Sequence, residues 1–420
     1  MCGFLVHRGS GDNSRISRRG PDATSVVRHN GLTFVHNLLS VTGEFTPQPF
    51  VNGDVFCVYN GQIYNQPFTR SDGEVLIPLY RRHGPSFANQ LDGEFAIALY
   101  DFAREIAVFA TDPFKTKPLF INGIECASYR SGVGGEKARP NEIVIKTFDG
   151  ALLDVMPVRR WDLTQWKSTY ADWMTAFETA VKKRAMPRCF IGLSSGYDSG
   201  ALACALLKLG VDFRAYVFQG EEDAEVLDAR RKLVDHQDFG PAYELAPWLS
   251  QVIDNEAYSI VCTDGVVSMK VLDDGATLGL ATIAKLAAGE GRRVALSGQG
   301  ADEILSDYSP WPEQSELKGR YPDVQRLWRN FNYSCQESYL LKEEYAGGAF
   351  GIESRYPFLD AELVQEFLWL SPDAKNRYYK APLREYLLRN RFPFEEGAKR
   401  GFRIDLNRPR SSAPEPECQP

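Results

Sequence analysis

Short stretches of apolar or alternating residues recur through the first 150 positions, and they predict β-strands. Gly, Pro, Asn and Asp residues separate these stretches, as expected of turns between strands. The predicted strands cover residues 3–7, 32–36, 55–59, 95–100 and 106–110. One helix interrupts them from about Asp72 to His83, because apolar positions there recur at helical spacing. Closely spaced strands with few helices favour stacked antiparallel sheets.

After about residue 160 the pattern changes to an alternation of helices and strands. Apolar positions between 170 and 181 recur at helical spacing. Strands are then expected over residues 189–193, 214–218 and 294–297, with a helix through Leu207 after the first and another from Ala224 after the second. Such alternation predicts a doubly wound parallel sheet with crossover helices. The expected boundary between the two patterns is the segment 151–168.

The composition restricts the class of protein without revealing its chemistry. With 44% hydrophobic residues in a chain of 420, the protein is too apolar to be disordered, and it lacks the repeats of a fibre. Its net charge of −7 argues against a broad basic surface for nucleic acid. No apolar run reaches the ~20 residues of a membrane helix, and the amino terminus lacks the apolar segment of a signal peptide. We therefore expect a cytoplasmic protein that binds neither nucleic acid nor membrane.

A loop of small residues follows the predicted strand 189–193 and leads directly into a helix. It reads Leu-Ser-Ser-Gly-Tyr-Asp-Ser over residues 193–199. Small side chains let backbone N–H groups approach a phosphate, and a helix N-terminus adds partial positive charge. Asp198 is a hard oxygen ligand suited to Mg²⁺. The loop has no lysine, so it is not a Walker A motif; the same residues would also suit a capped turn that binds nothing.

A second glycine-rich turn follows the strand predicted over residues 294–297. It reads Ser-Gly-Gln-Gly-Ala-Asp-Glu over residues 297–303, and Asp302 would supply a second carboxylate opposite Asp198. The carboxyl ends of parallel strands meet at one edge of a sheet, where ligands bind. The two turns together therefore indicate a nucleotide site more specifically than either does alone.

Cys2 directly follows the initiator Met and would become the first residue once Met1 is removed. A free α-amine titrates near ~7.7, so it can act as the base for its own thiol. The other seven cysteines form no CxxC pair or Cys/His cluster, so structural zinc is not expected and reduced thiols are. Asn60 and Gly61 end a predicted strand and can form an oxyanion hole. Asp72 opens a helix, where it would either bind a substrate ammonium group or serve as an N-cap.

These residues resemble the asparagine synthetase family over about residues 1–405, and the loop 193–199 is similar to the pyrophosphate-binding loop of ATP pyrophosphatases, with Ser195 in place of the first glycine. The matching landmarks lie at residues 2–3, 19–22, 60–61, 71–72, 91–96, 112–114, 117–119, 194–199, 297–303, 351–360 and 380–384. The resemblance implies an αββα sandwich of the N-terminal nucleophile type over residues 1–160. It implies a doubly wound ATP-pyrophosphatase domain over residues 161–406. The tail 407–420 is rich in Pro and Ser and is expected to be disordered.

For the first domain, the resemblance implies a glutaminase. Cys2 would attack the side-chain amide of glutamine, and Asn60 and Gly61 would stabilise the oxyanion. Gln62 and Asp72, together with Asn60 and Gly61, would bind glutamine. The released ammonia would pass through a tunnel to the second domain.

For the second domain, the resemblance implies that ATP adenylates a carboxylate, aspartate by default, and that ammonia converts the adenylate into an amide. Lys380 would stabilise the adenylation transition state, Asp198 and Asp302 would hold Mg²⁺, and Gln299 and Glu353 would lie near the acyl substrate. The residues implied to bind ATP are Leu193, Ser194, Ser195, Gly196, Asp198, Ser199, Phe218, Ser297 and Gly298. Glu353 has a second interpretation, as a salt-bridge partner of Arg355. The partners are small molecules, and a homodimer is compatible with the resemblance.

Two departures from the family pattern leave the reaction open. Leu38 stands where the family has an arginine for the α-carboxylate of glutamine, and a leucine cannot make that contact. Arg70, beside Asp72, is one candidate to replace it. Gln299 stands where asparagine synthetases have Glu and β-lactam synthetases have Tyr, so the acyl substrate need not be aspartate.

Three functions therefore stay open from the sequence. The first is a glutamine-dependent amidotransferase of asparagine synthetase type. The second is an adenylating ligase or cyclase, of β-lactam synthetase or lasso-peptide cyclase type, with a vestigial glutaminase half. The third is a regulatory relative without turnover, which the retained Cys2, Asp198, Asp302 and Lys380 disfavour.

Overall fold

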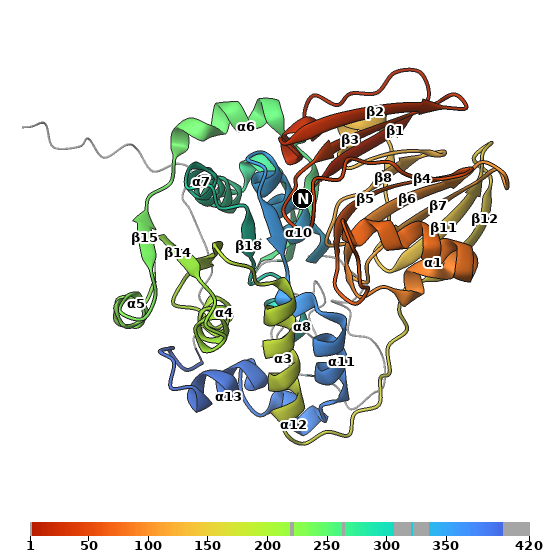
Figure 1. Ribbon diagram of the computed structural model, residues 1–420. Coiled ribbons are helices and arrows are strands. Elements are labelled where there is room, and N and C mark those ends of the chain that lie inside the picture. Colours follow the sequence, from red (N-terminus) through yellow and green to blue (C-terminus); the bar gives the residue numbers. More distant parts are fainter. Residues whose placement is uncertain (1, 219–221, 263–264, 306–320, 322–335, 398–420) are drawn as a thin grey trace, which may run out of the picture.

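The computed structural model describes residues 2–218, 222–262, 265–305, 321 and 336–397, and the tail 407–420 lies outside the described residues. Two antiparallel sheets occupy the amino-terminal half (Figure 1). The first has the order β10-β8-β9-β1-β3-β2, with β1 at Gly3–His7, β2 at Ala23–His29, β3 at Leu32–Leu38, β8 at Phe120–Asn122, β9 at Glu125–Ala127 and β10 at Glu136–Lys137. The second has the order β12-β11-β7-β6-β5-β4, with β4 at Phe50–Asn52, β5 at Val55–Ile63, β6 at Gly93–Asp101, β7 at Ile106–Thr111, β11 at Glu142–Thr147 and β12 at Leu152–Pro157.

Helices cover the outer faces of this sheet pair. Alternate residues of β1, β3, β5 and β6 meet in one apolar core between the two sheets. The outer face of the second sheet packs against α1 (Leu76–His83) and the short 3₁₀ helix Gly84–Gln90. The outer face of the first sheet packs against α6 (Ala246–Val252), α7 (Gly275–Gly289) and α10 (Gln336–Gly348), which belong to the carboxy-terminal half. The predicted αββα arrangement is confirmed, with one helical layer supplied from the other half.

A five-stranded parallel sheet forms the centre of the carboxy-terminal half, in the order β15-β14-β13-β18-β19. The strands are β13 (Cys189–Leu193), β14 (Phe213–Phe218), β15 (His236–Phe239), β18 (Val294–Leu296) and β19 (Glu353–Arg355). The strand order reverses between β13 and β18, and such a switch point opens a crevice at the carboxyl ends of the strands. Both predicted loops begin there.

Helices pack on both faces of the parallel sheet, which confirms the predicted doubly wound fold. One face contacts α3 (Ala171–Arg184), α4 (Tyr197–Lys208), α11 (Ala361–Trp369) and α13 (Ala381–Arg389), and the other contacts α7. The remaining elements are α2 (Arg130–Val133), α5 (Ala224–Arg231), α8 (Ala301–Leu305), α12 (Pro372–Asn376), the hairpin β16 (Ala257–Cys262) with β17 (Gly265–Lys270), and 3₁₀ helices at Ile16–Arg19, Asp72–Val75, Tyr243–Leu245, Val271–Asp273 and Pro357–Leu359. Within the described residues, no helix is long and apolar enough to cross a membrane.

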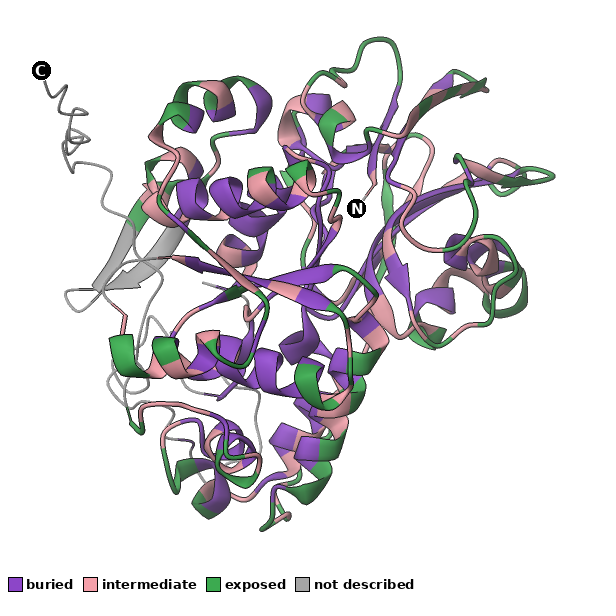
Figure 2. Ribbon diagram, turned by 60° about the vertical axis from the view of Figure 1, so that its left-hand side comes forward, coloured by how far each residue is buried: buried purple, intermediate pink, exposed green. Residues whose placement is uncertain are grey.

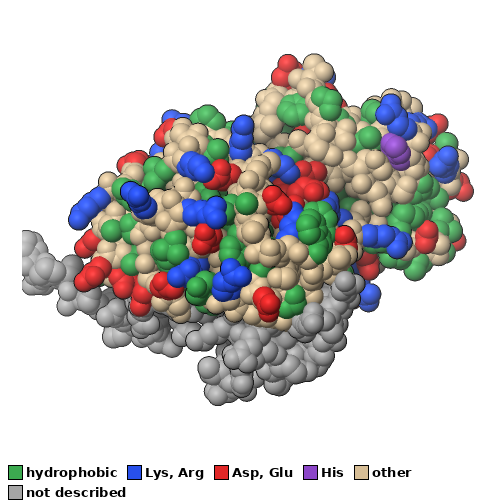
Figure 3. Space-filling view, turned by 90° about the horizontal axis from the view of Figure 1, so that it is seen from below, with side chains coloured by type: hydrophobic (Ala, Val, Ile, Leu, Met, Phe, Trp, Pro, Cys, Tyr) green, Lys and Arg blue, Asp and Glu red, His purple; other side chains and the backbone are tan. Residues whose placement is uncertain are grey.

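The buried residues lie between the layers of sheets and helices, and many of the charged side chains lie on the surface. Buried residues line the strands of both halves, and exposed residues gather on the outer turns and helix faces (Figure 2). On the face seen from below, both acidic and basic side chains are present (Figure 3).

One local expectation was wrong, and the helix expected from about Asp72 to His83 is confirmed. Asn60 and Gly61 do not end a strand, because β5 continues to Ile63 and pairs along its whole length with β6. The extended ladder passes through Gly61 because this residue has a φ of +150°, and a Cβ there would lie 1.9 Å from the carbonyl oxygen of Glu94. The helix expected from Asp72 begins as a 3₁₀ turn, Asp72–Val75, before α1 starts.

Candidate active sites

Cys2 lies immediately before β1, an inner strand of the first sheet. The residue as a whole is partly exposed, whereas Cys57, Cys126, Cys189 and Cys204 are buried. Burial raises the pKa of the Cys2 thiol, and the nearby carboxylates of Glu353 and Asp72 raise it further. A thiol in this surrounding needs a base to become a nucleophile.

The Asn60 side chain is fully buried in β5, yet neither Nδ2 nor Oδ1 has a hydrogen-bond partner among the described residues. Buried polar atoms are nearly always paired, so such an atom calls for an explanation. An amide donor without a partner is what an oxyanion hole requires.

Asp72 lies at the centre of a buried hydrogen-bond cluster. One carboxylate oxygen accepts from Gln62 Nε2 at 2.9 Å, from the Ile63 backbone N–H at 2.8 Å and from the Tyr59 hydroxyl. Burial raises the pKa of Asp72. The N-cap of the 3₁₀ turn is Ser71, so Asp72 does not act as the cap. The structure thus brings Gln62 and Asp72 together and presents a carboxylate suited to an ammonium group.

Arg355 connects this cluster to the parallel sheet. Its Nη2 donates to Gln62 Oε1 at 3.1 Å and to Thr42 Oγ1 at 3.2 Å. Its Nε donates to Glu353 Oε1 at 2.7 Å, which is the salt bridge considered from the sequence. Its backbone carbonyl accepts the Ser297 N–H at 2.9 Å. Sequence reasoning missed this role, although Arg355 lies within the landmark 351–360.

Arg70 does not take a place in the Asp72 cluster. Its side chain is 54% exposed, and its Nε lies 3.4 Å from Glu44 and 3.9 Å from Glu74. Leu38, at the position where the family has an arginine, is buried. The buried cation that contacts a predicted glutamine-binding residue is therefore Arg355, not Arg70.

The loop after β13 folds back on itself through its serines. The Ser194 N–H donates to Ser199 Oγ at 3.0 Å, and the hydroxyls of Ser194 and Ser199 lie 2.8 Å apart. Gly196 is the N-cap of α4, so the loop ends at a helix N-terminus. The Ser195 N–H donates to the carboxylate of Glu222 at 2.8 Å. The loop therefore presents its donors to an anionic group.

Lys380 joins the two predicted metal ligands. Its Nζ lies 2.7 Å from Asp198 Oδ1 and 2.7 Å from Asp302 Oδ1. Burial alone would lower the pKa of the Lys380 ammonium, but the carboxylates of Asp198 and Asp302 raise it well above its usual value. Lys380 adopts the left-handed conformation, with a φ of +46°, directly before α13. Strained non-glycine residues of this kind cluster at functional sites.

The second turn lies against the first. A Cβ on Gly298 would lie 3.2 Å from the Cβ of Asp198, so the two loops are in contact. Ser297 Oγ donates to Glu343 Oε2 at 2.7 Å and accepts from the Gln299 N–H at 3.1 Å. Burial raises the pKa of Glu343 to about 7.

The remaining predicted residues occupy the expected strand ends. Leu193 and Phe218 are the last residues of β13 and β14, and Phe218 packs against Phe239. Glu353 opens β19, where burial opposes its ionisation, but the amino terminus, Arg355 and Lys117 lower its pKa. The negative charge of Glu353 raises the pKa of the Cys2 thiol.

Comparison with known proteins finds a matching family model for the amino-terminal part and relatives that cover nearly the whole chain. A family model described as a glutamine amidotransferase domain matches residues 10–137. An asparagine synthetase (glutamine-hydrolyzing) of Asparagus officinalis is 26% identical, and the alignment covers 94% of this chain and 74% of the relative. A probable asparagine synthetase (glutamine-hydrolyzing) of Schizosaccharomyces pombe is also 26% identical, covering 93% of this chain and 80% of the relative. The chain is similar to glutamine-hydrolyzing asparagine synthetases over nearly its whole length.

A solved structure, the glutamine phosphoribosylpyrophosphate amidotransferase of B. subtilis, is 12% identical, with a TM-score of 0.31 over 57% of this chain and 81% of that chain.

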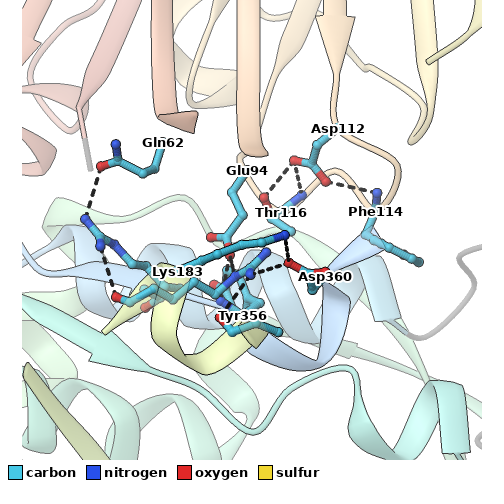
Figure 4. Close-up of polar contacts among 12 residues, drawn as sticks. Gln62, Glu94, Asp112, Phe114, Thr116, Lys183, Tyr356 and Asp360 are labelled. Carbon is cyan, nitrogen blue, oxygen red and sulfur yellow. Dashed lines mark hydrogen bonds and ion pairs between the residues drawn. The ribbon is translucent and has the colours of Figure 1, made fainter. Parts of the chain in front are cut away.

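A buried ionic network joins the two halves of the chain (Figure 4). Glu94 of β6 accepts from Arg184 Nε at 2.6 Å and from the Tyr356 N–H at 2.9 Å. Asp360 lies 2.8 Å from Arg184 Nη1 and 2.9 Å from Lys183 Nζ. Apart from Glu353, the residues of the landmarks 91–96 and 351–360 had no assigned role in the sequence. The structure places Glu94, Tyr356 and Asp360 in this junction.

Proposed function

We propose that this protein is a glutamine-dependent ligase of the asparagine synthetase type. It adenylates a carboxylate with ATP, aspartate by default, and transfers ammonia from glutamine to form an amide, with release of AMP and pyrophosphate. The glutamine-hydrolyzing asparagine synthetases to which the chain is similar support this reaction. Activation by ATP is physically required, because a carboxylate oxygen is a poor leaving group and AMP is a good one.

In this proposal, residues 1–160 hydrolyse glutamine. After removal of Met1, the α-amine of Cys2 takes the thiol proton and the thiolate attacks the glutamine amide. The Asn60 amide, whose Nδ2 has no partner among the described residues, stabilises the oxyanion together with Gly61. Asp72 and Gln62 hold the α-amine of glutamine, since the carboxylate of Asp72 is buried beside Gln62.

Residues 161–406 carry out the adenylation in this proposal. The loop 193–199 binds the pyrophosphate of ATP, and Lys380 stabilises the charge that develops on the phosphates. Asp198 and Asp302 converge on one ammonium at 2.7 Å each, so their carboxylates fit Mg²⁺. The described residues hold no group of three or more metal-ligating side chains, but Mg²⁺ in nucleotide sites takes one or two carboxylates and completes its shell with phosphates and water. When bound, the ion would neutralise phosphate charge.

The observation that carries this proposal is the position of Arg355 between the two sites. Its side chain donates to Gln62 in the glutamine site, and its carbonyl accepts from Ser297 in the nucleotide site. One residue therefore touches both sets of predicted residues. Such a connection favours two half-reactions that work together over two unrelated functions in one chain.

The test is to incubate the full chain with ATP, Mg²⁺ and glutamine, with and without aspartate, and to follow glutamate and pyrophosphate. We expect aspartate-dependent pyrophosphate with a matching amount of glutamate. Cys2→Ala should abolish glutamate release and keep pyrophosphate formation driven by ammonium. Asp198→Asn should abolish pyrophosphate formation, whereas Asp228→Asn, a change at an exposed carboxylate of α5, should not.

Two outcomes would contradict the proposal. Pyrophosphate formation without glutamate release, at the same rate in Cys2→Ala as in the parent, would remove glutamine as the nitrogen donor. Glutamate release with no pyrophosphate for any carboxylate tested would remove the ligase half.

A further inference from the structure

Arg230 of α5 lies directly beneath the loop that follows β13. Its Nη1 donates to the carbonyl of Gly196 at 2.9 Å and to the carbonyl of Ser194. Gly200 makes this approach possible, because a Cβ at that position would lie 2.2 Å from Arg230 Nη2. The side chain is fully buried, and its guanidinium stacks on Phe392 with 5.5 Å to the ring centroid. No function considered from the sequence used this residue.

The charge of Arg230 is not balanced by a direct partner. No ion pair to Arg230 lies within 4.0 Å among the residues that the structure describes, and its Nη2 has no hydrogen-bond acceptor there. Burial lowers its pKa to about 10, so the guanidinium is still charged at neutral pH, and the carboxylates of Glu222 and Asp198 act against that decrease. A buried charge without a contact partner is costly and is retained where it serves another group.

Arg230 also fixes the direction of the loop donors. In a trans peptide the C=O and the N–H point to opposite sides. Because the Ser194 carbonyl points at Arg230, the Ser195 N–H of the same peptide points away from it. The Gly196 carbonyl fixes the Tyr197 N–H in the same way. The guanidinium therefore holds two N–H groups toward the far side of the loop.

An acidic side chain of the protein accepts one of these donors, the Ser195 N–H. The Glu222 carboxylate takes a hydrogen bond from the Ser195 N–H at 2.8 Å and a second from the Ser195 hydroxyl. The adjacent Asp223 N–H donates to Ser195 Oγ at 3.1 Å, which ties the start of α5 to the loop. A carboxylate at this position has the charge and the acceptor oxygens that a phosphate would bring.

We propose that Arg230 is the positioning cation of the pyrophosphate loop and that Glu222 is its internal competitor. Arg230 aims the loop donors at the pyrophosphate of ATP and supplies the positive charge that a loop without lysine lacks. Glu222 accepts from the N–H and the hydroxyl of Ser195 in the free protein and leaves when pyrophosphate binds. This inference rests on the proposed adenylation by ATP and deepens the assignment of that site.

The experiment measures binding of inorganic pyrophosphate with Mg²⁺ to the full chain by isothermal titration calorimetry, followed by ATP with Mg²⁺. Glu222→Gln removes the competing charge and should tighten pyrophosphate binding about tenfold, the scale of one charge-assisted hydrogen bond. Arg230→Met should weaken it by about tenfold or more. The opposite directions separate this mechanism from general damage to the loop, which would weaken binding in both variants.

Matched controls lie on the same helix. Glu225→Gln changes an exposed carboxylate, and Arg231→Met changes a guanidinium that pairs with Asp228 and Asp238 on the surface. Neither control should shift the dissociation constant. Arg230→Lys keeps the charge without the planar fork, so it should bind with intermediate affinity. If Arg230→Met does not fold, Glu222→Gln and Arg230→Lys still test the inference.

Unchanged or weaker binding in Glu222→Gln would overturn the role of Glu222 as a competitor, and weaker binding would mark it as a ligand instead. Parent affinity in both Arg230 variants would overturn the role of Arg230. These outcomes differ from failure of the proposed function, in which the parent itself would bind neither ATP nor pyrophosphate.

Discussion

The two candidate sites differ in how their polar side chains are paired. Asn60 is buried with both amide atoms unpaired among the described residues, whereas Lys380 is held between two carboxylates at 2.7 Å each. The sequence indicated both residues, but it could not show that one awaits a partner and the other already has two. This difference predicts that the glutamine site binds by filling unmet hydrogen bonds and that the nucleotide site binds by replacing internal ones.

Replacement of Asn60 by Ala tests the role of this one side chain in the oxyanion hole. We expect the kcat for glutamine hydrolysis to decrease about 100-fold, because the oxyanion would lose a preorganised donor. The stability should change little or increase, since two unpaired buried polar atoms are removed. Glutamate release and thermal unfolding measure the two effects. Gln66→Ala, at a partly exposed residue of the loop after β5, should leave both unchanged. An unaltered kcat in Asn60→Ala would exclude its role in the oxyanion hole.

Secondary-structure elements were predictable where a single apolar pattern determines them. The predicted strands at residues 3–7 and 189–193 coincide with β1 and β13, and α5 begins at Ala224 as expected. The end of β5 was not predictable, because an Asn-Gly pair usually marks a turn. Here Gly61 stays in the ladder opposite Phe95, and only the approach of β6 requires this conformation.

The packing of α12 predicts a pH-dependent stability. Burial lowers the pKa of Lys375 to about 7, against ~10.4 for an exposed lysine. Between those pH values the unfolded chain binds more protons than the folded protein, so the free energy of unfolding should increase as the pH rises above about 7. Lys375→Met should remove this increase, which amounts to at most ~1.4 kcal/mol per pH unit.

Urea unfolding at several pH values from about 7 to about 9 measures this slope. Lys208→Met is the matched control, because its side chain is 51% exposed and should leave the slope as in the parent. The same slope in Lys375→Met as in the parent would show that Lys375 titrates normally.

At the scale of the whole molecule, buried ion pairs connect the two halves. Glu94 and Asp360 come from different halves and share Arg184 at 2.6 and 2.8 Å, with every side chain nearly inaccessible. Lys117 links the same junction to Glu344 at 2.9 Å. The assignment of residues 1–160 and 161–406 to two domains, the homodimer and the cytoplasmic location stay predictions.

Removal of the positive charge of Arg184 tests how much the buried ion pairs between the halves stabilise the protein. Arg184→Met removes the cation that two buried carboxylates share, so that Glu94 keeps only Lys117 at 3.4 Å and Asp360 only Lys183 at 2.9 Å. This loss should lower the free energy of unfolding by roughly 3–5 kcal/mol. Arg159→Met is the control, since Arg159 and Glu362 also pair across the halves, at 2.8 Å, but Glu362 is 62% exposed. This exposed pair should contribute less than about 1 kcal/mol. Chemical denaturation measures both, and equal losses would contradict the role of burial.

The sequence by itself determined the two sheet types, the loops at 193–199 and 297–303, and the candidate nucleophile Cys2, because apolar periodicity and short motifs depend on neighbours along the chain. Tertiary structure alone decided which distant side chains meet. It brought Arg355 to Gln62, Lys380 between Asp198 and Asp302, and the start of α5 against the Ser195 loop. Those contacts depend on how the sheets and helices pack, and no local pattern of residues encodes that packing.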